Sequence, residues 1–237
     1  MKKLFLLLML CVILFSCQKQ EDVKMVTISF QTNILSGNPM TKSSSNECLD
    51  IIHELTQYGS ITLKSADISG NGIEYTATLD ETIVVPEGNY DIYYNDNPIN
   101  VAGIFYSTPP LEYHSKRIYI YEENKIINID LYYNCYAIFV PTSECDKVIY
   151  LYKNSYGKYE FPKVGNYFFG FFTDGFNGIT LFPKDRPNDY ETIALSTDGE
   201  DESIKVDKGK YYILHPDDID VESSFIVNIQ DMVEGII

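Results

Sequence analysis

Residues 84–94 read VVPEGNYDIYY, and the pattern of this stretch decides the fold. Two valines lead into a turn with the composition PEGN, after which Tyr90, Ile92 and Tyr94 alternate with other residues. A period of two places alternate side chains on the same face of a β-strand. A short strand, a turn that contains proline and glycine, and a second strand with one apolar face therefore indicate an antiparallel β-protein.

The same pattern recurs from one end of the chain to the other. Val26, Ile28 and Phe30 alternate with polar residues near the start, and residues 225–229 alternate in the same way near the end. Turn signals rich in Gly, Asn and Asp separate further apolar runs of strand length, which lie at residues 61–63, 118–121, 126–140, 148–152, 167–172, 179–182, 192–195, 204–206 and 211–214. Short strands at such regular spacing predict an all-β fold built from antiparallel β-sandwiches.

One helix interrupts the strands, and we expect it to cover residues 45–57. Ser44 and Glu47 have the spacing of a capping box, and Gly59 ends the helix. The apolar residues of the segment fall on one stripe with a 3.6-residue period, formed by Cys48, Ile51, Ile52 and Leu55. This stripe predicts that Cys48 is a small buried core residue.

The N-terminus predicts export and lipid anchoring. Two lysines precede an apolar run at residues 4–15, which has the length of a signal-peptide core. The following Leu14-Phe15-Ser16-Cys17 resembles a bacterial lipobox. We therefore expect residues 1–16 to be a signal peptide, Cys17 to be acylated and residues 17–25 to form a tether. An ordinary secretory signal with a chance cysteine is the alternative.

Length and charge limit the remaining possibilities. The formal net charge is −16, and removal of residues 1–16 takes away two lysines and no acid, which makes it −18. Such a surface repels nucleic acid, because binding to a phosphate backbone requires the opposite sign. The mature chain can form two sandwich domains of ordinary size. A break near residues 134–146 predicts domains at 26–133 and 134–237.

The sequence contains no recognisable catalytic motif, so we expect neither an enzyme nor a bound cofactor. The three histidines, His53, His114 and His215, have no partner spacing. Acidic runs at 198–202 and 217–222 could supply oxygen ligands to calcium, but solvated turns explain them better, so no metal site is predicted.

Cys135 and Cys145 flank an extended stretch, and the sequence leaves open whether they form a disulfide.

The aromatic run YFFGFF at residues 167–172 has two interpretations. It could present rings that stack on sugars, or it could be a strand that is buried on both faces. A continuous apolar run is typical of a strand buried on both faces, and we therefore expect burial.

Three stretches resemble the fimbrillin-related lipoproteins of Bacteroidetes, which are the subunits of type V pili and their anchors. They are VTISF at 26–30 after the lipoprotein start, TKS at 41–43, and VPEGNYDIY at 85–93. The resemblance implies two transthyretin-like domains and a role in pilus assembly or adhesion. It also implies cleavage at Lys42, where the family more often has arginine. The acids that follow Cys17 resemble an export signal to the outer face of the outer membrane.

The resemblance further implies a partner, because family pilins join by giving a strand to the next subunit. Residues 225–237 have the composition of such a donor strand, and cleavage at Lys42 would remove the strand at 26–30 to open an acceptor groove. Two alternatives stay open. The C-terminal segment could be the last strand of its own sandwich, and the chain could be a stand-alone surface lipoprotein that binds a glycan or a host ligand.

Overall fold

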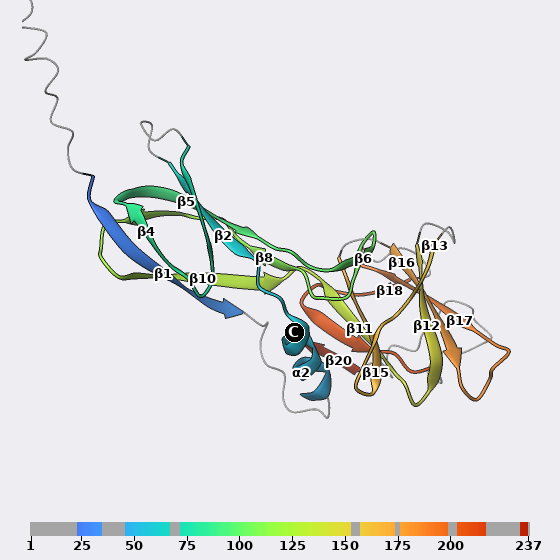
Figure 1. The fold of residues 1–237 in the computed structure, drawn as a ribbon. Helices are drawn as coiled ribbons and strands as arrows, with labels where there is room; N and C mark the ends of the chain where they lie inside the picture. Colours follow the sequence, from blue (N-terminus) through green and yellow to red (C-terminus); the bar gives the residue numbers. More distant parts are fainter. Residues whose placement is uncertain are drawn as a thin grey trace, which may run out of the picture.

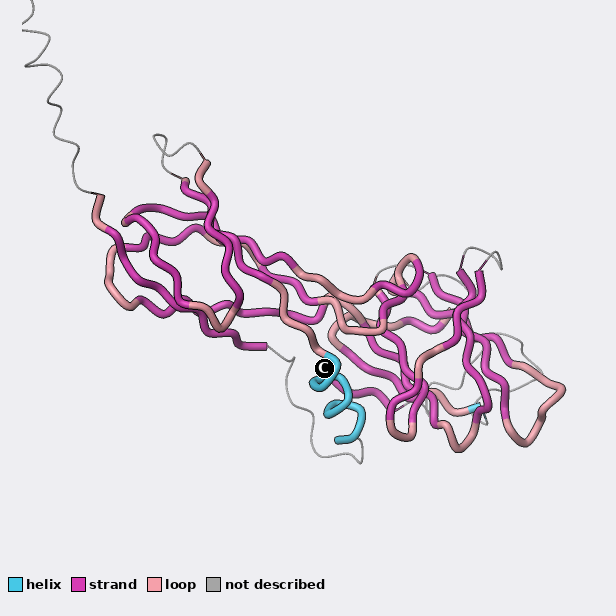
Figure 2. The backbone as a smooth tube through the Cα atoms, viewed as in Figure 1, coloured by secondary structure: helices cyan, strands magenta, loops and turns pink. Residues whose placement is uncertain are grey.

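The structure, a computed structural model, describes residues 23–34, 46–66, 72–152, 157–173, 176–198, 203–216 and 233–236. Within these ranges strands predominate, and α2 (Asn46–Leu55) is the one α-helix (Figure 2). This confirms the predicted all-β class with a single short helix. The strands form four sheets, here called sheets A to D, which make two sandwiches arranged end to end in an elongated molecule (Figure 1).

Sheets A and B form the sandwich at the N-terminal end. Sheet A has the strand order β4 (Thr82–Pro86), β1 (Met25–Ile34), β10 (Lys125–Tyr133) and β8 (Leu111–Tyr113). Sheet B has the order β3 (Glu74–Thr78), β2 (Ser60–Ser65), β5 (Gly88–Asn95) and β9 (Arg117–Ile120). The apolar positions of the two sheets meet in one core, because alternate side chains on each strand point inward.

The stretch at 84–94 forms strands as predicted, but its turn joins two sheets. Strand β4 ends at Pro86 in sheet A, and β5 begins at Gly88 in sheet B. The Tyr90 hydroxyl donates a hydrogen bond to the Pro86 carbonyl oxygen at 2.8 Å, and this bond ties the crossing together. Strand β2 pairs antiparallel with the following β3, and residues 67–71 between them lie outside the described ranges.

Sheets C and D form the second sandwich. Sheet C has the order β20 (Val233–Ile236), β19 (Lys210–Ile213), β11 (Tyr136–Pro141), β15 (Tyr167–Phe172), β7 (Phe105–Tyr106) and β6 (Asn100–Ala102), and β14 (Lys163–Val164) also pairs with β15. Sheet D has the order β13 (Gly157–Glu160), β12 (Cys145–Tyr152), β16 (Phe176–Pro183), β17 (Glu191–Ser196) and β18 (Ile204–Lys205).

Sheet C is buried on both faces, which explains the aromatic run. Phe168 and Phe172 point into the core shared with sheet D, whereas Phe169 and Phe171 share a second core with α2. The Glu47 carboxylate accepts a hydrogen bond from the Asn166 side-chain amide at 3.1 Å, which fixes the start of the helix beside β15. The expectation that residues 167–172 form a strand buried on both faces is therefore confirmed, and these rings are not an exposed sugar platform.

Two segments from the first half of the chain pack with the second sandwich. One is α2, and the other is the β6–β7 hairpin, whose β7 pairs with β15. Gly170 makes room for this hairpin, since a Cβ atom there would lie 2.6 Å from Cε2 of Phe105. The run at 126–140 is two strands, β10 and β11, which belong to sheets A and C. The domain division at residue 134 stays a prediction.

The described cysteines are all buried and unpaired. Cys135 and Cys145 do not form the disulfide that the sequence left open, and they belong to separate hydrophobic clusters. Cys48 lies in α2 and is fully buried, which confirms its predicted role as a core residue. Burial raises the pKa of the Cys48 thiol and of the Cys145 thiol to about 12, so both remain protonated at neutral pH.

Candidate functional site on the outer face of sheet D

The predicted processing sites lie outside the described residues. Neither Cys17 nor Lys42 is within the described ranges, and the same holds for the acidic run at 217–222 and for most of the run at 198–202. Among the described residues, no three His, Cys, Asp or Glu side chains lie close enough together to hold a metal ion. Acylation, cleavage and calcium binding therefore remain expectations from the sequence.

The three histidines occupy three separate places. His53 is exposed on α2, and His114 stacks on Tyr132 with ring centroids 5.0 Å apart. His215 lies 2.8 Å from Glu144, between Nδ1 and Oε2, beside the turn that joins β11 to β12. Each histidine has a local packing or surface position, and the fold does not assemble them into one site.

Strand β1 is the first structural feature with a functional implication. It lies in the middle of sheet A, where it pairs antiparallel with β4 and parallel with β10 (Figure 1). Val26 and Ile28 are fully buried, and Phe30 is 8% exposed. The strand directly precedes the segment that contains Lys42, so a cut there would leave β1 joined to the rest of the protein by non-covalent contacts alone.

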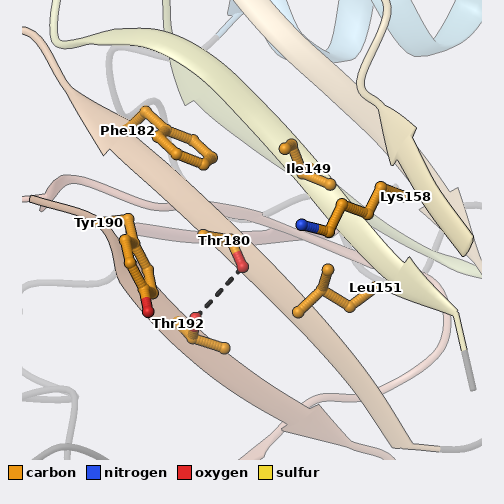
Figure 3. A pocket seen from close by; sticks show the side chains of 7 residues that line it. All are labelled: Ile149, Leu151, Lys158, Thr180, Phe182, Tyr190 and Thr192. Carbon is orange, nitrogen blue, oxygen red and sulfur yellow. Dashed lines mark hydrogen bonds between the residues drawn. The ribbon is translucent and has the colours of Figure 1, made fainter. Parts of the chain in front are cut away.

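The second feature is a depression on the outer face of sheet D, with a volume of about 360 Å³ (Figure 3). Four neighbouring strands and the loop before β17 provide its seven lining side chains, which are Ile149, Leu151, Lys158, Thr180, Phe182, Tyr190 and Thr192. Register brings them together, since Ile149 lies opposite Thr180 and Thr180 lies opposite Thr192. The volume falls in the range of about 300–1,000 Å³ that is typical of small-ligand sites.

The floor of the depression is well covered although it belongs to an outer face. Ile149 is 7% exposed and Thr180 is 6% exposed. The Thr180 and Thr192 hydroxyls lie 3.2 Å apart, so one donates a hydrogen bond to the other and leaves acceptor capacity toward the depression. The floor therefore offers an apolar surface beside a pair of hydroxyl groups.

Aromatic rings form one side of the depression. Phe182 and Tyr190 have ring centroids 6.2 Å apart and planes inclined by 36°, and the Tyr190 side chain is 68% exposed. Figure 3 shows Tyr190 and Phe182 on one side and Lys158 on the other, with Thr180 between them. An exposed ring next to a hydroxyl pair can bind a ligand that has both an apolar face and polar groups.

Lys158 supplies a positive charge on the opposite side. Its side chain extends from β13 between Ile149 and Leu151, and its ammonium group points toward Thr180 (Figure 3). No described acidic side chain forms an ion pair with Lys158, whereas the nearby Lys147 pairs with Glu160 at 2.6 Å. The depression thus combines stacking surfaces, hydroxyl groups and one cation that has no acidic partner in the described part of the chain.

The sequence predicted three strands of this site, β12, β16 and β17, but neither β13, which carries Lys158, nor the site itself. Thr180 and Thr192 are ordinary strand residues in sequence, and only the sheet register places them side by side. Polar residues on the outward positions of β16 and β17 indicate a solvated face, but they do not indicate a depression. Tyr190, just before β17, was the one available signal, because an exposed ring at a strand entrance can contribute to binding.

Comparison with known families gives no sequence match. No family model matches this chain, and no curated protein matches it. Among the described residues, none of the helical structure is long and apolar enough to cross a membrane.

Comparison with solved structures finds distant likenesses. A candidate cell adhesion protein from Bacteroides uniformis is 9% identical with a TM-score of 0.38, over 68% of this chain and 88% of its own. A candidate cell adhesion protein from Bacteroides eggerthii is 10% identical with a TM-score of 0.37, over 80% and 84%. A shaft pilin from Lactobacillus rhamnosus is 7% identical with a TM-score of 0.33, over 71% and 92%. Likenesses at this level carry no argument about function.

Proposed function

We propose that this chain is a lipid-anchored protein of the bacterial outer membrane with a structural or adhesive role at the cell surface, as a fimbrillin-like pilus subunit or anchor. Adhesion and pilus proteins are among its distant structural neighbours, but the proposal does not rest on them. The observation that carries it is the position of β1 in the middle of sheet A, together with Lys42 in the segment that follows.

A middle strand can be exchanged only if it carries its own set of core side chains. Strand β1 meets this requirement, because it lies between β4 and β10 and its three inward residues are buried in the core between sheets A and B. Their removal would expose an apolar groove that has unpaired backbone groups on both sides, and both losses are costly in water. An extended segment from another subunit, placed in the same register, would restore the hydrogen bonds and the core.

The C-terminal end is engaged within its own chain. Strand β20 pairs antiparallel with β19, with Lys210 opposite Ile236. This end would have to leave sheet C before it could be given to a neighbour. Of the predicted donor segment at 225–237, only residues 233–236, which form β20, lie within the described residues. An uncut chain with β1 and β20 both in place fits an anchor or a subunit before maturation.

The anchor is tested by metabolic labelling with a fatty-acid analogue. We expect label on the wild-type protein and none on Cys17→Ser, and we expect protease added to intact cells to degrade the wild-type protein. Equal labelling of the two proteins would overturn the anchor, and complete protection in intact cells would overturn surface display.

Assembly is tested by limited digestion with a trypsin-like protease, with Lys42→Gln as the uncut control. We expect the chain cut after Lys42 to form oligomers that increase with concentration, and a version truncated after Ser224 to remain monomeric. Cut protein that stays monomeric at high concentration would contradict polymerisation and favour an anchor.

The depression on sheet D favours a second function, that of a stand-alone surface protein that binds a glycan or a host ligand. Six of its lining residues lie on sheet D and the seventh lies in the loop before β17, at a distance in the fold from β1 in sheet A (Figure 1). Display at the surface and ligand binding are compatible, so the two functions can coexist in one chain.

A further inference from the structure

We propose that the depression on sheet D binds an acidic sugar, with the sugar carboxylate at Lys158, the sugar face on Tyr190 and the sugar hydroxyls at Thr180 and Thr192. For its biological role this inference rests on the proposed surface function. Its chemistry rests on the seven lining side chains alone.

Charge is the first argument for an acidic ligand. The chain has a formal net charge of −16, yet the depression contains a lysine without an acidic partner among the described residues. Two acids on strands of the same sheet are already engaged. Glu160 pairs with Lys147 at 2.6 Å, and Glu191 pairs with Arg186 at 2.8 Å. A bound carboxylate would therefore meet the Lys158 charge with little competition or repulsion from these acids.

The surroundings of Lys158 strengthen this attraction. Its aliphatic stem runs between Ile149 and Leu151, which leaves the ammonium group above a floor that is largely shielded from water (Figure 3). A charge-assisted hydrogen bond is roughly twice as strong as a neutral one. Because Lys158 is exposed, salt should screen its interaction with a carboxylate.

The aromatic side of the depression argues for a sugar over a simple anion. The C–H bonds on the apolar face of a pyranose ring carry partial positive charge, which is attracted to the negative face of an aromatic ring. Tyr190, at 68% exposure, presents such a face to solvent, and Phe182 supports it at 6.2 Å. Inorganic phosphate would use Lys158 and leave both rings unused.

The hydroxyl pair argues in the same direction. Thr180 and Thr192 bond to each other at 3.2 Å, and each hydroxyl keeps acceptor capacity for a sugar hydroxyl. A neutral sugar would use the rings and the hydroxyls but not Lys158. The three features are used together only by a ligand that has an apolar face, several hydroxyls and a carboxylate. A hexuronic acid or a sialic acid has this combination.

The test compares two sugars that differ only at C6, where glucuronic acid has a carboxylate and glucose has a hydroxymethyl group. Glucuronic acid and glucose are titrated separately into the full mature chain carrying Cys17→Ser, and binding is followed by nuclear magnetic resonance shifts. We expect glucuronic acid to bind about tenfold more tightly than glucose, with the difference reduced as salt is raised. Equal binding of the two sugars, or no binding of either up to tens of millimolar, would overturn the proposal.

Variants assign the contributions of the side chains. We expect Lys158→Gln to weaken the binding of glucuronic acid about tenfold and to leave the binding of glucose unchanged. We expect Tyr190→Ala to weaken the binding of both sugars. Lys116→Gln, an exposed lysine of the other sandwich, is the matched control and should have no effect. Circular dichroism establishes that each variant is folded. A control that weakens binding as much as Lys158→Gln would overturn the assigned site.

Inorganic phosphate separates a sugar site from an anion site. We expect phosphate to bind much more weakly than glucuronic acid, and we expect its affinity to be unchanged by Tyr190→Ala. Phosphate that binds as tightly as glucuronic acid would overturn the sugar assignment. Failure of these binding tests would leave acylation at Cys17 and surface display intact, so the outcome is distinguishable from failure of the proposed function.

Discussion

Sheets A and C differ in how many of their faces are covered, and the difference can be read in their sequences. Strand β10 of sheet A alternates between buried and exposed residues, and Ile126 on its outer face is 60% exposed. Strand β11 of sheet C has no exposed position over its six residues. Alternation therefore marks one covered face, and a continuous apolar run marks two.

The second cover of sheet C comes from a distant part of the chain. Helix α2 precedes β2 in sequence but packs on β11, β15 and β19 of the other sandwich (Figure 1). Two hydrogen bonds mark its position, one from Asn166 to Glu47 at 3.1 Å and one between the hydroxyls of Thr56 and Tyr133 at 3.1 Å. The helix thus links the two sandwiches.

The largest effect is expected from emptying the core between α2 and sheet C. Phe171 is fully buried there, and we expect Phe171→Ala to lower the free energy of unfolding by about 3–5 kcal/mol. Ile126→Ala, on the uncovered face of sheet A, is the matched control and should change it by less than about 0.5 kcal/mol. Chemical denaturation measures both, and equal losses would contradict the difference between the faces.

A smaller loss is expected from the helix side of the same core. Ile52 is fully buried in α2, and we expect Ile52→Ala to cost about 2–5 kcal/mol, toward the lower end because fewer atoms are removed than in Phe171→Ala. Hydrogen exchange should show that Ile52→Ala speeds amide exchange, relative to wild type, more in α2 than in sheet A. Uniformly faster exchange in both sandwiches would mean that α2 does not open separately from the rest.

The smallest effect is expected on the exposed face of sheet B, where Arg117 pairs with Asp91 through Nε–Oδ1 at 2.7 Å and Nη2–Oδ2 at 2.9 Å. Hydrogen bonding from Arg117 lowers the pKa of Asp91 below its ordinary value. The pair therefore contributes stability above the ordinary carboxyl pKa, and this contribution disappears as pH falls through the lowered pKa.

We expect Arg117→Ala to reduce the melting temperature slightly at pH 7, and we expect the difference from wild type to disappear as the pH falls through the lowered pKa of Asp91. Thermal melts at several pH values measure this. A difference that is constant with pH would mean that Arg117 acts through packing of its side chain and not through its charge.

The sequence predicted the strands that alternate or run continuously, and it predicted α2 to within two residues of each end. It missed β6 and β7, which have three and two residues, because strands this short lack a period. The pairing of β7 with β15 depends on contacts between residues more than sixty positions apart, such as Phe105 opposite Phe172. Pairings over such distances leave no local pattern in the sequence.

The candidate site was less accessible to prediction than the fold. Lys158 and Thr180 belong to strands β13 and β16, which meet only through the intervening β12. Local sequence reveals that each residue faces outward, but not that they face each other. The predictions for Cys17 and Lys42 are of the opposite kind, since they depend on short linear motifs that processing enzymes read without the fold.

Strand exchange at β1 tests the central claim most directly. A recognition sequence for a site-specific protease is inserted after Lys42, and the cut and uncut chains are each incubated with a labelled peptide of residues 23–34. We expect the cut chain to take up one labelled peptide, the uncut chain to take up none, and a peptide carrying Ile28→Asp to be rejected, because Ile28 is fully buried in sheet A. A cut chain that takes up no label, or that accepts the Ile28→Asp peptide equally well, would contradict β1 as an exchangeable strand.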